Sequence, residues 1–283
     1  ADRVFAVVGG LAQQMLTPAG QLLTLQEAAR RVQVGLTAWS GLADKPELLS
    51  ETLALIDECK SCMIEPETLF RASKESALDE DAALSAKLCD LAQILTQYDS
   101  LCEETLPDPR DRLTHLRDGL AESHVLDGAE VYLDGFLSYT PQELAIIEVM
   151  LSSGVPLTAA VTCDVELPDV FVTGCRTLRT LTRMAERHDR RPEIVNLGAS
   201  RLSRPAGLAA VAEEALLPVR GTHEDASGVR LYEAASPFDE CEHAAAYIRR
   251  KVRDEGARYR DFVVAARDIA PYSASLAMAM GRY

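Results

Sequence analysis

The stretch VYLDGFLSYTPQEL, residues 131–144, joins a short apolar run to an aspartate and then to a helix start. Residues 131–134 combine β-branched, aromatic and aliphatic side chains, which is typical of a short buried strand. Thr140-Pro141-Gln142-Glu143 has the sequence of a capping box with proline at the first helical position. Nucleotide-driven motors hold magnesium through an acidic residue at the end of such a strand, so Asp134 is the first candidate site residue.

The residues that follow predict a second strand beside the first. The helix that opens at Thr140 is expected to end at Gly154, which is a good C-terminal stop. The β-branched run LTAAVTCD, residues 157–164, ends at Asp164. A strand, a helix and a strand in this order favour two parallel strands with a right-handed crossover.

A similar order of elements recurs near the end of the chain. Residues 229–235 and 261–267 read as strands, and Ser236-Pro237 opens a helix between them that stops at Gly256. The last segment, after Pro271, begins as an amphipathic helix without an evident terminator. The two α/β patterns, separated by a loop-rich stretch, predict two α/β lobes.

The first hundred residues read as helices. One apolar face runs through residues 81–102 at alternating spacings of four and three, made by Leu84, Leu88, Leu91, Leu95, Tyr98 and Cys102. Asp79 is the expected N-cap, and Asp81 adds negative charge to the first turn. Core packing is the favoured interpretation of this face, and a partner-binding seam is the alternative.

Composition narrows the class of protein. The chain has 283 residues and is 47% hydrophobic, which is enough for more than one domain, and no apolar run could span a membrane. Seven scattered cysteines favour reduced thiols in a cytoplasm. Cys59 and Cys62 form a CxxC, but a metal site needs two more ligands and no second CxxC or CxxH exists, so two ordinary thiols are favoured.

Charge is distributed unevenly along the chain. The formal net charge is −15, and residues 41–130 hold 8 Lys/Arg against 21 Asp/Glu. Downstream, five arginines recur at spacings of three and four, which places them on one face of a helix: Arg176, Arg179, Arg183, Arg187 and Arg190. Such a face can track a phosphate backbone, or it can be a solvated surface partly paired with Glu186 and Asp189. No aromatic residue interleaves these arginines, so base stacking is not predicted.

Two observations argue against a working motor in this chain. No GxxxxGK[ST] phosphate-binding loop occurs in it. A hydrolysing motor also needs a carboxylate beside the magnesium-binding aspartate, and here that neighbour is Gly135. A strand-end aspartate that bonds the following turn is therefore favoured over a live metal site, and the chain is expected to hold no catalytic residue and no metal.

At this point the sequence resembles a known family. VYLDGFLSYTPQEL followed by LTAAVTCD, and SPFDECEHAAAYIRRKVRDEGARYRDFVVAARDIAPY, are similar to the B subunit of the AddAB helicase–nuclease. The last stretch also resembles the start of the second motor lobe of UvrD-like superfamily 1 helicases. The residues that match that pattern are Glu242, Ile248, Gly256, Asp261, Val263, Val264 and Arg267. The resemblance covers most of residues 40–283, and it is specific in 128–164 and 229–283.

The resemblance implies a fold class and roles for the strand-end residues. It implies α/β, RecA-like pieces of parallel sheet with a large inserted helical subdomain. Asp134 would match the first acid of the helicase DExx box, with Gly135 in place of the catalytic glutamate, so together they form a vestigial Walker B position. Asp164 would match the acid that ends the next motor strand. No residue after it clearly matches the glutamine with which helicases sense phosphate.

The resemblance also implies an organisation and partners. Residues 1–105 would be the helical subdomain inserted in the first lobe, 106–225 the C-terminal part of that lobe, and 226–283 the beginning of the second. The chain would be part of a motor-inactive subunit that pairs with the A subunit and handles DNA in a complex for double-strand-break repair. ATP would be used in the complex, with Mg and a 4Fe-4S cluster in a nuclease domain beyond this chain. The alternative is an acidic helical adaptor that binds a protein partner without contacting nucleic acid.

Overall fold

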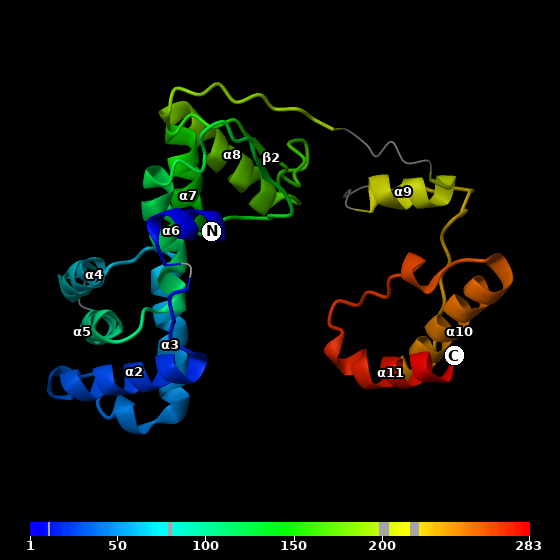
Figure 1. Ribbon diagram of the computed structural model, residues 1–283. Coiled ribbons are helices and arrows are strands. Elements are labelled where there is room, and N and C mark those ends of the chain that lie inside the picture. Colours follow the sequence, from blue (N-terminus) through cyan, green and yellow to red (C-terminus); the bar gives the residue numbers. More distant parts are fainter. Residues whose placement is uncertain (11, 79–80, 198–203, 216–220) are drawn as a thin grey trace. The chain divides into compact units, whose positions relative to one another are not determined.

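The computed structural model describes residues 1–10, 12–78, 81–197, 204–215 and 221–283 (Figure 1). The chain divides into two compact units, Ala1–Asn196 and Leu197–Tyr283. This division does not test the domain limits expected at residues 105 and 225, which stay predictions. The RecA-like class also stays a prediction, because the described residues contain one two-stranded sheet and are otherwise mostly helical.

The first unit holds most of the regular structure. Its elements are α1 (Asp2–Val8), α2 (Pro18–Val32), α3 (Pro46–Ser61), α4 (Pro66–Leu78), α5 (Ala82–Glu104), α6 (Arg112–Glu122), β1 (Val131–Leu133), α7 (Pro141–Ser152), β2 (Leu157–Ala159) and α8 (Val172–Arg187). Short 3₁₀ turns lie at Gln33–Gly35, Leu42–Asp44 and Pro109–Asp111. The second unit contains α9 (Ala206–Glu214), α10 (Pro237–Glu255) and α11 (Ser273–Arg282), with 3₁₀ turns at Tyr259–Asp261 and Ala270–Tyr272.

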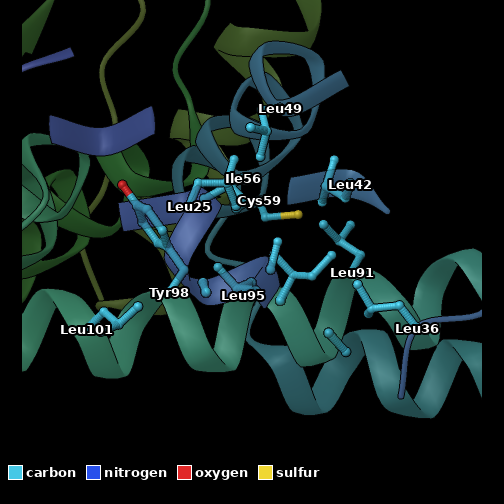
Figure 2. Packing of buried hydrophobic residues seen from close by; sticks show 14 of the residues in the cluster. Leu25, Leu36, Leu42, Leu49, Ile56, Cys59, Leu91, Leu95, Tyr98 and Leu101 are labelled. Atoms are coloured by element: carbon cyan, nitrogen blue, oxygen red, sulfur yellow. The ribbon is translucent and has the colours of Figure 1, made fainter. Parts of the chain in front are cut away.

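The helices α2 to α5 share one hydrophobic core. Figure 2 shows Leu91, Leu95 and Tyr98 of α5 directed toward side chains of α2 and α3. The apolar face predicted for 81–102 is therefore core packing through most of its length. Its N-terminal end departs from that prediction, because Leu84 is 44% exposed.

The cap of α5 differs from the expected one. Asp79 lies outside the described residues. Asp81 occupies the N-cap position, and its carboxylate accepts a hydrogen bond from the backbone N–H of Leu84 at 3.0 Å. The residue assigned to the first turn thus satisfies one of the free N–H groups of the helix itself.

The two strands form the predicted parallel pair. Val131 lies opposite Leu157, and Leu133 lies opposite Ala159. Leu133 and Leu157 pack against α7 and α8, whereas Tyr132, which points to the opposite face, is 70% exposed. The second strand is shorter than expected, since only 157–159 of the run 157–164 pairs.

The two strands predicted in the second unit are wrong. Residues 229–235 and 261–267 contain no strand, although the helix between them begins and ends as expected. Ser236 caps α10 by accepting from the N–H of Asp239, and Gly256 ends it in the left-handed region. A β-branched composition favours extended backbone, but a strand also needs a neighbour for its ladder, and these segments pair with no described residue in that way.

Thr140 allows a direct test of the helix start next to the sheet. Its hydroxyl accepts from the N–H of Glu143 at 3.3 Å, and the Glu143 carboxylate accepts from the N–H of Thr140 at 2.7 Å. Replacing Thr140 by Ala should lower the free energy of unfolding by about 1 kcal/mol, because one N–H of α7 loses its partner. Urea unfolding should show this loss for Thr140→Ala and nearly wild-type stability for Thr140→Ser. Equal losses in both variants would contradict the role of the hydroxyl.

Candidate functional site

The strand-end carboxylates bond the turns that follow them. Oδ1 of Asp134 accepts a hydrogen bond from the backbone N–H of Gly135 at 2.8 Å, and the residue is exposed. Oδ1 of Asp164 accepts from the N–H of Glu166 at 2.8 Å. Within the described ranges, no group of three or more His, Cys, Asp or Glu side chains is placed to hold a metal ion. Each carboxylate thus acts in its own turn, which is the plain structural interpretation of a strand-end acid.

The backbone at Gly135 disfavours the side chain that a motor would need there. Its φ is +81°, in the left-handed region that favours glycine. A Cβ at this position would meet no atom within 4 Å, so space is not the obstacle. A glutamate at residue 135 would nevertheless have to adopt a strained backbone. The residues around Asp134 therefore do not fit a catalytic magnesium–nucleotide site.

The helix α8 is fixed tightly to this end of the sheet. A Cβ on Gly174 would lie 2.0 Å from the carbonyl oxygen of Thr162, so only glycine permits this approach. The hydroxyl of Thr177 donates to the carbonyl of Leu137 in the loop after β1 at 3.0 Å. On the same helix, Met184 and Ala185 are buried against α7. These contacts hold α8 across both strand-exit loops.

Four of the five predicted arginines lie on α8 and are exposed. Arg176, Arg179 and Arg183 form no salt bridge within the described residues, and Nε of Arg179 donates to the carbonyl of Cys175 at 3.1 Å. The side chains of Arg183 and Arg187 also line an open hollow on this helix, together with Thr180, Met184 and Glu186. An exposed, largely unpaired row of guanidinium groups can contact successive phosphates.

Arg190 does not belong to this face, contrary to the sequence-based prediction. The helix ends at Arg187, and Asp189 adopts a φ of +56°, which turns the chain. A Cβ placed on Gly154 would lie 2.6 Å from Nη2 of Arg190, so this guanidinium sits beside the C-terminal end of α7. Spacing continued the helical period by one turn too many, because a left-handed residue at the helix end is not evident from arginine spacing.

The expected pairing of the arginines is also different in detail. Glu148 of α7 lies 3.4 Å from Nη1 of Arg187 and 3.4 Å from Nε2 of His188. Neither Glu186 nor Asp189 forms a salt bridge among the described residues. Glu148 gave no periodic signal with the arginines, because it lies about forty residues upstream on another helix. Its contact leaves the Arg176–Arg183 part of the face as the freely charged part.

The thiols of the CxxC are ordinary ones. Cys59 is buried in the helical core, and burial, followed by the charge of Glu58, raises the pKa of its thiol. Cys62 follows the last residue of α3 and is half-buried. A raised thiol pKa disfavours the thiolate that a metal requires. Of the helices that the structure describes, none is both long enough and apolar enough to cross a membrane.

Comparison with known proteins decides the family. A family model described as ADDB, N-terminal matches residues 1–210. The chain belongs to this family. The resemblance to the B subunit of the AddAB helicase–nuclease is thereby confirmed.

Relatives of this ADDB-family chain share one description, the B subunit of an ATP-dependent helicase/deoxyribonuclease. The protein from Thermoanaerobacter pseudethanolicus is 28% identical over 282 residues, covering 96% of this chain and 24% of the relative. The protein from Acetivibrio thermocellus is 27% identical over 293 residues (100% and 25%). The protein from Geobacillus thermodenitrificans is 30% identical over 286 residues (95% and 24%). The chain spans about a quarter of the length of the curated relatives it matches.

Proposed function

We propose that this chain is a helicase-like part of an AddB-type subunit that has lost motor chemistry and serves as a scaffold with a DNA-contacting face. Membership of the ADDB family and the name of its relatives support a role in a DNA helicase and nuclease complex for double-strand-break repair. In this proposal the A subunit is the partner, the setting is cytoplasmic, and ATP, Mg and a 4Fe-4S cluster act elsewhere in the complex.

The observation that carries the proposal is the turn at Asp134 and Gly135. The aspartate is engaged by the next N–H, and the residue in place of the catalytic glutamate has a left-handed backbone. A motor site needs both carboxylates free to hold magnesium and to orient water. The parallel strand pair and the helix start survive as architecture, so shape is retained while the catalytic group is lost.

The proposal predicts no magnesium-dependent ATP turnover by this chain. We expect the wild type, Asp134→Ala and the control Asp169→Ala, which replaces another exposed aspartate, to give the same background rate in a phosphate-release assay. Asp134 holds a turn and no ion, so its loss should change no rate. Turnover that disappears in Asp134→Ala and persists in Asp169→Ala would contradict the proposal.

The exposed arginines of α8 predict a salt-sensitive contact with DNA phosphates. Replacing Arg179 and Arg183 by Ala should weaken binding of forked DNA by roughly tenfold at low salt and reduce the slope of log K against log[salt] by about 1.5 to 2. Arg30→Ala/Arg71→Ala is the matched control, since both residues are exposed and lie on the helices α2 and α4. Equal losses in the two double variants would assign the effect to net charge and contradict a contact at α8.

The acidic helices favour a second candidate function, an adaptor for a protein partner. Glu51, Glu67 and Glu75 are exposed and form no salt bridge with any described cation. A basic surface on a partner would complement them. Replacing all three by Gln should weaken capture of the A subunit under this alternative. Unchanged capture, together with loss of DNA binding in the α8 variant, would favour the first function.

A further inference from the structure

Two thiols meet where the loop after β2 touches the first turn of α8. Sγ of Cys175 donates to the carbonyl of Asp164 at 3.5 Å, and Asp164 directly follows Cys163. The position of a Cβ on Gly174, the neighbour of Cys175, lies 3.0 Å from the Cβ of Cys163. Cys163 and Cys175 are thus held in contact by segments whose backbones cannot move apart without breaking the Gly174 approach.

We propose that Cys163 and Cys175 form a reversible disulfide that fastens the start of α8 to the loop after β2. A disulfide needs Cβ atoms within about 3.5–4.5 Å, and pairs much farther apart require backbone movement. Here the close approach at Gly174 already brings the two segments together, so bond formation needs a small side-chain adjustment. The inference goes beyond the proposed function, because it concerns a covalent modification that neither DNA contact nor scaffolding requires.

Exposure sets the order of the reaction. Cys163 is half-buried and Cys175 is buried, so an external oxidant reaches Cys163 first. Burial, followed by the neighbouring Cys175 thiol, raises the pKa of Cys163. The attack is therefore slower than that of an ordinary exposed thiol, and the bond is expected to form over hours.

The reaction is a thiol–disulfide exchange with a small-molecule disulfide, such as oxidised glutathione. The Cys163 thiolate attacks one sulfur of the oxidant, the oxidant's S–S bond breaks, and one reduced thiol leaves. The Cys175 thiolate then attacks the Cys163 sulfur of the mixed disulfide and releases the second reduced thiol. The two protons of the cysteines pass to the two leaving thiolates. The protein loses two electrons and the oxidant gains them.

The other cysteines in the first unit are poorer candidates. Cys59 and Cys102 are buried in the helical core, and burial raises the pKa of Cys102 to about 12. Cys62 lies close to Cys59 at the end of α3, so that pair is the competing product. Oxidation that links Cys59 to Cys62 and leaves Cys163 free is therefore the outcome to distinguish.

Peptide mapping gives a sharp readout, because no Lys or Arg lies between residues 117 and 176. Trypsin leaves both thiols on the peptide 118–176, and further cleavage after Glu166 separates them only when no disulfide joins them. After incubation of the whole chain with oxidised glutathione and alkylation of free thiols, we expect the two halves to remain linked. Dithiothreitol should release them. Cys241→Ser is the matched control and should behave like the wild type.

Stability provides a second readout that a chance crosslink would not reproduce. Closing the segment between Cys163 and Cys175 should raise Tm by roughly 5–10 °C in the oxidised wild type and in Cys241→Ser. Cys163→Ser and Cys175→Ser should show no such shift. Free, alkylated Cys163 and Cys175 after oxidation, or a glutathione that stays on Cys163 without exchange to Cys175, would overturn the proposal.

Discussion

Replacing Lys60 by Met should lower the free energy of unfolding of the first unit by about 3–5 kcal/mol. The side chain of Lys60 is 8% exposed, and its Nζ lies 2.7 Å from Asp99 and 2.7 Å from Asp111. The fully buried Asp108 is 3.9 Å away. Methionine keeps the apolar stem but leaves these carboxylates without their cation, in a place where water cannot replace it.

The pH dependence of this effect follows from the pKa of Lys60. Burial alone would lower that pKa, but the charges of Asp99 and Asp111 outweigh burial and raise it above its ordinary value. A raised lysine pKa gives a stability contribution that is fully present below the ordinary pKa, and that is lost as pH rises through the folded-state pKa. Denaturant titrations at pH 6 to 9 should therefore show a constant difference between the wild type and Lys60→Met. A difference under about 1 kcal/mol would contradict the account.

Replacing Asp90 by Ala is expected to cost about 3 kcal/mol. The residue is 1% exposed, and its carboxylate accepts from the backbone N–H groups of Thr37, Ala38 and Trp39 at 2.7 to 3.1 Å. Alanine leaves three amides of this turn without their charged acceptor. Hydrogen exchange should show faster exchange at these three amides, and urea unfolding should show the loss of stability.

A matched control separates the buried carboxylate from an ordinary cap. Asp81→Ala removes an exposed N-cap from the same helix and should cost only about 1 kcal/mol. Asp90→Asn keeps one acceptor oxygen, so its loss should lie between those of the wild type and Asp90→Ala. Unchanged exchange at residues 37–39 in Asp90→Ala would contradict the role assigned to the carboxylate.

Local patterns predicted the elements whose determinants lie close together in sequence. The capping box at Thr140, the stop at Gly256 and the buried stripe of α5 are each specified within one or two turns of chain. The parallel pairing of β1 and β2 followed from the helix between them. The strands expected at 229–235 and 261–267 failed because a ladder depends on a neighbour that composition does not specify.

Long-range contacts were outside the reach of such patterns. Lys60 meets Asp111 across 51 residues, and Asp90 meets Thr37 across 53. Neither pairing leaves a periodic signal, because the partners lie on different elements. At the site, the spacing of the arginines predicted α8, but neither the turn after Arg187 nor the contact with Glu148 could be read from it.

The most direct test of the proposed function is the anisotropy of a labelled forked DNA titrated with this chain at several salt concentrations, with and without ATP and magnesium. We predict that log K falls linearly with log[salt] and is the same with and without nucleotide, because the arginines of α8 contact phosphates and Asp134 holds no ion. Nucleotide-dependent affinity that is abolished by Asp134→Ala, or no binding even at the lowest salt concentration, would contradict a motor-inactive, DNA-contacting scaffold.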